Sequence, residues 1–195
     1  MISFIVVVLF FTINIEAQNI ERKELDLQLA YNRIISDKSS ENWIKYFELF
    51  PSTFEKFDSI FGYRNYQEGT LYDMYQQYID LFFKAKDFVK GDVFYDKIIR
   101  LAKDGAWDAD AVSLFQSSIV NFVINASTYP QERMLFLEVL SSFSDTDITN
   151  FWRFYFDDLY PDCYGDKYKK TISALQGFER LLLIINEIYK TICEK

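Results

Sequence analysis

The residues best suited to chemistry in this 195-residue chain are carboxylates that follow aromatic side chains. The chain has no histidine, which excludes Ser-His-Asp and Cys-His catalysis and histidine metal ligation. Asp157 and Asp158 follow a stretch dense in aromatic residues, and a carboxyl group beside aromatic rings can have a raised pKa and act as a general acid. With Glu138 or Asp110, such a group could form a two-carboxylate hydrolase site. Acids are also ordinary at helix ends, so a hydrolase is the alternative interpretation.

A second group of aromatic and acidic residues lies in Gly105-Ala106-Trp107-Asp108-Ala109-Asp110. In one interpretation, Trp107 packs on the following helix as a corner residue and the two aspartates favour the start of that helix. In the other interpretation, Trp107, Asp108 and Asp110 line a groove together with Asp157. These four residues are the predicted binding site for a protein or peptide partner.

Metal, phosphate and nucleic-acid sites are not indicated. Asp145 and Asp147 begin like a calcium loop, but Asn150 stands where glycine is required and Phe156 where glutamate is required. No glycine-rich phosphate loop is present. The formal net charge is −8, and residues 104–165 contain two basic and ten acidic residues, so no basic stripe could neutralise phosphates. We therefore expect no cofactor, no metal and no nucleic-acid partner, whereas a basic partner would suit the acidic stretch.

The N-terminus resembles a secretion signal. The apolar run from Ile2 to Ile13 has the length of a signal-peptide core and is too short to span a bilayer. Ala17 supplies a small residue for cleavage, so residues 1–17 are the predicted signal peptide. The mature protein is expected to be periplasmic or extracellular, without a transmembrane segment; an N-terminal strand or an uncleaved anchor is the alternative. In an oxidising compartment Cys163 and Cys193 could form a disulfide, or they could be two buried thiols.

Helical spacing of apolar residues dominates the rest of the chain. Glycine and proline make up only 9 of 195 residues, too few for a many-stranded sandwich or barrel. We predict an all-α fold, an irregular bundle of eight to nine helices, with residues 18–195 forming a single domain. A helical-repeat-like stack is the second choice. The expected helices cover about 20–35, 40–50, 54–61, 70–82, 92–105, 108–123, 128–140, 144–156 and 166–192, and residues 62–70 are expected to be a polar loop.

Several phrases resemble a group of small exported bacterial proteins without assigned function. They are Phe50-Pro51-Ser52-Thr53-Phe54-Glu55-Lys56-Phe57, Phe61-Gly62-Tyr63, Gly105-Ala106-Trp107-Asp108-Ala109-Asp110-Ala111-Val112 and Phe151-Trp152-Arg153-Phe154. The resemblance implies a helical fold and an envelope or extracellular location, and it implies no activity, cofactor or catalytic residue.

The leading hypothesis is an exported, non-enzymatic helical protein that binds a protein or peptide partner. The main alternative is a small carboxylate-dependent hydrolase acting on envelope glycans or peptides. A third possibility is a carrier that holds a small molecule or lipid in an apolar cavity between helices.

Overall fold

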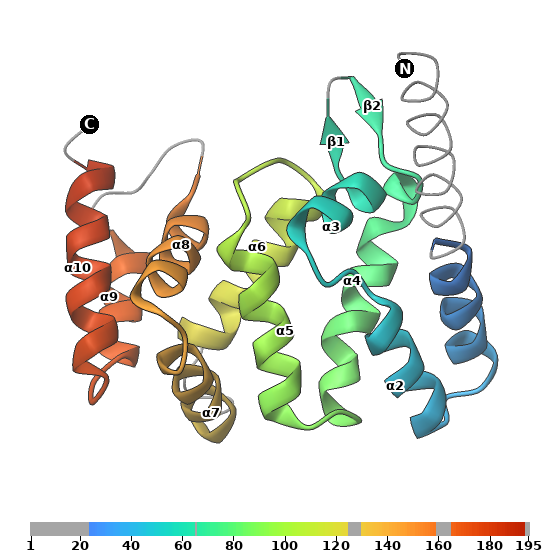
Figure 1. The fold of residues 1–195 in the computed structure, drawn as a ribbon, viewed down its shortest axis with the longest axis horizontal. Coiled ribbons are helices and arrows are strands. Elements are labelled where there is room, and N and C mark those ends of the chain that lie inside the picture. The colour runs from blue at the N-terminus through green and yellow to red at the C-terminus, as the bar shows by residue number, and fades with distance from the viewer. Residues whose placement is uncertain (1–23, 65, 125–129, 159–164, 194–195) are drawn as a thin grey trace, which may run out of the picture. The chain divides into compact units, whose positions relative to one another are not determined.

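The computed structural model describes residues 24–64, 66–124, 130–158 and 165–193 (Figure 1). Within them the regular secondary structure is helical apart from one short hairpin, which confirms the all-α prediction. The chain divides into two compact units, one ending at Phe50 and the other beginning at Pro51. In these described residues, no helix is long and apolar enough to cross a membrane.

The first unit contains a helix over residues 24–36 and helix α2 (Ser40–Leu49). Asp37 lies between them and organises the turn. Its backbone oxygen and its carboxylate both accept hydrogen bonds from Asn42 Nδ2, at 2.9 and 3.0 Å. Pro51 follows directly after the end of α2, consistent with a proline that stops a helix.

The second unit contains the remaining helices. They are α3 (Phe54–Phe61), α4 (Tyr75–Lys84), α5 (Gly91–Lys103), α6 (Ala111–Ile124), α7 (Pro130–Ser141), α8 (Asp145–Phe156), α9 (Asp166–Ala174) and α10 (Glu179–Cys193). Two short 3-10 turns, η1 (Tyr72–Met74) and η2 (Ala85–Asp87), flank α4. Side-chain caps begin two of the helices: Thr53 accepts from Lys56 N at the start of α3, and Ser144 accepts from Asp147 N at the start of α8.

Phenylalanine rings from several helices of the second unit meet in its core. The ring centroids of Phe57 and Phe115 are 5.1 Å apart, and those of Phe82 and Phe94 are 5.5 Å apart. Phe154 joins them from α8, 6.3 Å from Phe115. All five rings are buried, and burying a phenylalanine contributes roughly 1.5–3 kcal/mol. Helix α5 packs against α3, α7 and α8 around this cluster (Figure 1).

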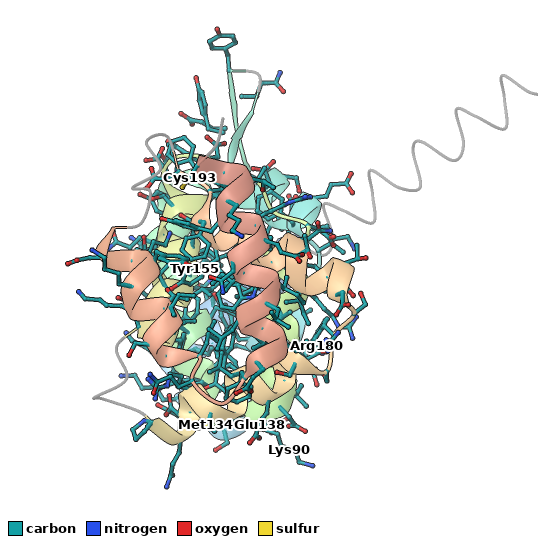
Figure 2. The ribbon with its side chains drawn as sticks, turned by 90° about the vertical axis from the view of Figure 1, so that its left-hand side faces the viewer. Lys90, Met134, Glu138, Tyr155, Arg180 and Cys193 are labelled. Carbon is teal, nitrogen blue, oxygen red and sulfur yellow. The ribbon has the colours of Figure 1, made fainter. Side chains whose placement is uncertain are left out.

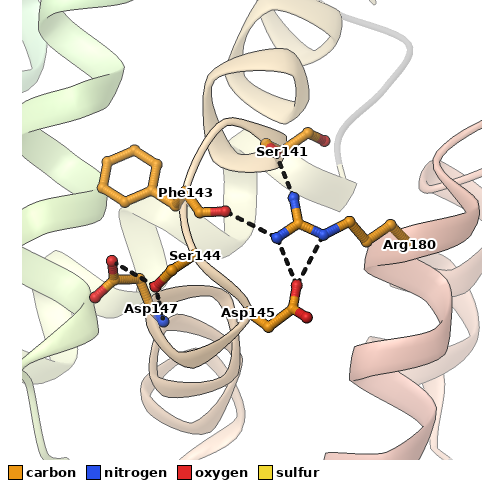
Figure 3. Close-up of polar contacts among 6 residues, drawn as sticks. All are labelled: Ser141, Phe143, Ser144, Asp145, Asp147 and Arg180. Carbon is orange, nitrogen blue, oxygen red and sulfur yellow. Dashed lines mark hydrogen bonds and ion pairs between the residues drawn. The ribbon is translucent and has the colours of Figure 1, made fainter.

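Helix α10 attaches to the rest of its unit through an arginine at its start. Figure 2 looks onto α10, with Arg180 near its first turn and Cys193 at its last residue. Arg180 donates to the backbone oxygens of Ser141 at 2.7 Å and Phe143 at 3.0 Å, and its Nε donates to Asp145 Oδ1 at 2.8 Å (Figure 3). One planar guanidinium therefore connects α10 to the turn between α7 and α8.

Two of the expected elements differ from the structure. The predicted loop over 62–70 contains an antiparallel hairpin of β1 (Tyr63–Arg64) and β2 (Gln67–Glu68), in which Tyr63 lies opposite Glu68. The predicted single helix over 166–192 is two helices, because Gly177 adopts a left-handed φ of 90° that ends the helical path between α9 and α10.

Candidate functional site

The loop between α5 and α6 is tied to the end of α8. The backbone N–H of Trp107 donates a hydrogen bond to Asp157 Oδ2 at 2.8 Å. Two residues earlier, Gly105 lies so close to Phe154 that a Cβ atom on it would be 2.5 Å from a carbon of that ring. The structure thus brings Trp107 and Asp157 together, as the predicted site requires, and leaves the Trp107 side chain half-buried.

Gln116 is a residue of this region that the sequence analysis missed. It is buried on α6, and its Nε2 donates to the backbone oxygens of Phe154 at 2.5 Å and Asp157 at 2.7 Å. These carbonyls lie at the end of α8, where the last backbone oxygens of a helix have no N–H donor within the helix itself. The only signal in the sequence is a glutamine among the apolar residues of a helical face, beside Phe115 and Ile119.

Asp108 and Asp110 have different environments. Asp108 Oδ1 accepts a hydrogen bond from the N–H of Ala109 at 2.7 Å, a contact within the loop. Asp110 directly precedes α6 with a left-handed φ of 55°, and its carboxylate accepts a hydrogen bond from the hydroxyl of Tyr72. Asp110 therefore faces η1, whereas Asp157 lies at the end of α8.

Four tyrosines form what we call the tyrosine face: Tyr72, which contacts Asp110, its ring neighbours Tyr63 and Tyr75, and Tyr66 in the same hairpin as Tyr63. The ring of Tyr72 lies between its neighbours, with its centroid 5.9 Å from that of Tyr63 and 6.0 Å from that of Tyr75. Tyr63 is 44% exposed and Tyr66, at the tip of the hairpin, is 94% exposed. The hairpin extends beyond α3 and α4 (Figure 1).

The electrostatics of Tyr72 show which charges lie near this face. The hydrogen bond to Asp110 raises the pKa of the Tyr72 hydroxyl to about 12, because losing the proton would break the bond and place two negative charges together. The carboxylate of Glu68 adds to the same effect. Both acids are therefore close enough to the tyrosine face to act on a bound group.

Lys167 is a second residue whose environment the sequence did not reveal. Its Nζ donates to the backbone oxygen of Tyr155 and lies 4.9 Å from the centroid of the Tyr155 ring and 5.5 Å from that of Phe156. Burial lowers the pKa of this amine to about 8, although the charges of Asp158 and Asp157 oppose the change. Figure 2 places Tyr155 behind α9 and α10. Lys167 thus donates to a carbonyl near the end of α8, while burial disfavours its charged form.

The predicted disulfide and signal peptide fall partly or wholly outside the described residues. Cys193 is disulfide-bonded at the end of α10. Cys163 lies outside the described residues, so the pairing of Cys163 with Cys193 stays a prediction. Residues 1–17 also lie outside them, and the cleavage site after Ala17 stays a prediction as well.

Two surface hollows of the second unit contain a carboxylate. One, of about 90 Å³, is lined by Lys86, Gly91, Phe94, Tyr95, Glu132 and Leu135. The other is a shallow hollow along α7 that includes Met134 and Glu138, which Figure 2 shows side by side. Each has a single carboxylate, and that of Glu132 is already paired with Lys86 at 2.8 Å. Neither hollow has the two carboxyl groups that glycoside hydrolysis requires.

Among the described side chains, no three carboxylates or cysteines converge as a metal-binding group. Comparisons with protein-family models, with curated proteins and with solved structures gave no match to this chain.

Proposed function

We propose that this protein is exported, is not an enzyme, and binds a protein or peptide partner through the tyrosine face and Asp110. The observation that carries the proposal is the row of tyrosine rings beside a carboxylate that Tyr72 holds in place. Tyrosine is enriched at protein interfaces because its large amphipathic ring gives contact area with few rotatable bonds. A surface of this kind suits recognition better than catalysis.

The four residues predicted from sequence take two roles in this proposal. Asp110 would contact the partner, because it lies beside Tyr72 on the exposed side of the loop. Trp107 and Asp157 would position that loop, because their hydrogen bond holds it against the end of α8. Asp108, whose carboxylate turns to its own neighbour's N–H, would help to shape the loop.

Export is supported by separate features. The apolar run of Ile2–Ile13 and the small residue Ala17 suit a cleaved signal, and the disulfide-bonded state of Cys193 suits an oxidising compartment. Intact mass of the protein recovered from culture would test this, since removal of residues 1–17 leaves a chain that begins at Gln18. Recovery of only the full-length chain inside cells would contradict export.

Site-specific photo-crosslinking tests the binding surface. p-Benzoylphenylalanine is placed at Tyr66 in the full chain, and in a separate control at Leu183, a 68% exposed residue of α10. We expect one reproducible adduct from Tyr66, identified by mass spectrometry, that disappears when Asp110→Ala and Tyr72→Ala are added. The same adducts from both positions, or an adduct that survives those two substitutions, would contradict binding at the tyrosine face.

A further inference from the structure

We infer that the tyrosine face, together with Asp110 and Glu68, recognises an arginine-bearing segment of its partner. This inference rests on the proposed function and names the chemistry of the partner. It follows from three observations: the charge around the face, the arrangement of its rings, and the backbone of the hairpin tip.

The charge around the face is strongly acidic. The two segments that build it, 62–77 and 104–111, contain five acidic residues and one basic residue, Arg64. Among the side chains that the structure describes, Glu68, Asp73 and Asp110 form no ion pair with a lysine or arginine. An exposed group of carboxylates that outnumbers the basic residues around it favours a basic partner and disfavours an acidic one.

The ring arrangement matches a guanidinium group. An arginine side chain binds favourably over a tyrosine ring when it lies within about 6 Å of the ring centroid, and its planar donors can bind a carboxylate at the same time. Tyr72 offers both partners together, because its partly exposed ring lies between those of Tyr63 and Tyr75 and its hydroxyl holds the carboxylate of Asp110. Fixing that carboxylate in advance lowers the entropy lost on binding.

The protein already uses the same kind of contact internally. The guanidinium of Arg100 lies 5.3 Å from the ring centroid of Phe143 while its Nε donates to Asp96 at 2.7 Å. One arginine thus contacts a ring and a carboxylate at once, which is the combination that the tyrosine face offers to a partner.

The hairpin tip indicates that Tyr66 is present for a reason other than folding. Strands β1 and β2 are joined by a two-residue turn, a connection whose left-handed positions normally favour glycine or asparagine. Tyr66 occupies it with a φ of 63° and is 94% exposed, so its ring gains almost no packing in return for the strain. In the described part of the chain, Tyr66 and Asp110 are the two residues other than glycine with left-handed φ, and both belong to this surface.

Fluorescence anisotropy with a defined peptide tests the inference. The mature full chain is titrated against fluorescein-labelled (Gly-Arg)6, and against the same peptide with citrulline, a neutral near-isostere, or lysine in place of arginine. We expect the arginine peptide to bind more tightly than both others and to weaken as salt rises. Tyr66→Gly and Asp110→Asn should each weaken its binding by about two- to fivefold, the size of one exposed cation–ring or charge contact.

Two controls separate binding from folding. Glu187→Gln removes one negative charge from an exposed position on α10 and should leave binding unchanged. Tyr66→Gly should unfold at the same temperature as the wild type or higher, because glycine relieves the left-handed strain. Weaker binding without lower stability then assigns the effect to the ring.

The possible failures are distinguishable. Equal binding of the citrulline or lysine peptide, or unchanged binding by Tyr66→Gly and Asp110→Asn, would overturn the arginine inference while the crosslinked adduct at Tyr66 still supports partner binding. Arginine-peptide binding that depends on the face, without any specific adduct at Tyr66, would instead overturn the proposed function.

Discussion

The backbone N–H of Trp107 donates to Oδ2 of Asp157 across 2.8 Å, and this single bond joins residues fifty positions apart in the chain. It connects the loop that presents Asp110 to the residue that ends α8. The loop is therefore anchored to the end of α8 through Trp107, while the exposed Asp110 contacts Tyr72.

Asp157→Ala removes the acceptor of this bond, so we expect the free energy of unfolding to fall by about 1–2 kcal/mol. Asp157→Asn retains an oxygen that can accept from Trp107 and should lose less. Urea unfolding followed by tryptophan fluorescence measures the difference. Asp104→Ala, an exposed acid at the end of α5, is the matched control. Equal losses for Asp157→Ala and Asp104→Ala would show that the bond contributes nothing.

Arg180 and Asp145 should differ in importance although they form one ion pair. Arg180→Lys lacks the guanidinium that donates to Ser141 and Phe143 as well as to Asp145 (Figure 3). We therefore expect the free energy of unfolding to fall by about 1–2 kcal/mol. Asp145→Ala removes only a solvent-exposed partner and should lose less than about 1 kcal/mol. Chemical denaturation of both variants tests the order, and a larger loss for Asp145→Ala would contradict it.

Lys167 should make stability depend on pH in the alkaline range. Its pKa is about 8 in the folded protein and 10.5 for an ordinary lysine, so between these values the unfolded chain holds a proton that the folded chain has released. Stability therefore rises with pH in this window, by about 2 kcal/mol at most up to pH 9.5, below the range in which ordinary tyrosines ionise. Unfolding free energies of the wild type and Lys167→Met are compared at pH 7 and 9.5.

The wild type should gain stability relative to Lys167→Met as the pH rises. Lys169→Met removes an exposed lysine of the same helix and serves as the control, because its stability should change with pH as that of the wild type does. A constant difference between the wild type and Lys167→Met at both pH values would show that Lys167 does not titrate in this window.

Two glycines should be intolerant of alanine for different reasons. Gly177→Ala should lower the free energy of unfolding by about 1–2 kcal/mol through the left-handed φ alone, since no atom lies within 4 Å of the Cβ position. Gly177→Asn should lose less, because asparagine tolerates this conformation better. Gly105→Ala should lower the free energy of unfolding by about 1–3 kcal/mol, because the new Cβ collides with the ring of Phe154. The larger side chain of Gly105→Asn should lower it further. Thermal unfolding of the four variants distinguishes the two patterns.

The helices were predictable because their signals are local. Pro51 and the aromatic residues at three- and four-residue spacing mark the end of α2 and the whole of α3 within a dozen residues. The hairpin was not predictable, because its two-residue strands are too short for a period of two and its turn carries Tyr66 where glycine would be the usual signal. The break at Gly177 was missed because the apolar spacing continues across it.

The site was predictable only in part. Asp110 and Trp107 stand out in the sequence as an acidic and an aromatic residue between two predicted helices. Their partners do not, because Tyr72 is 38 residues away from Asp110 and Gln116 meets α8 only through the fold. Contacts of this range depend on how helices pack, and no local pattern records them.

Gln116 links α6 to the end of α8, so the two helices should open together when the protein unfolds locally. One side-chain amide of α6 binds two carbonyls at the end of α8, and the same end of α8 holds Trp107 through Asp157. Neither helix can fray at this junction without leaving buried polar groups without partners. Helices α6 and α8 and the Trp107 loop that precedes α6 should therefore exchange their amide protons as one cooperative unit, slowly and together, while the hairpin tip exchanges independently.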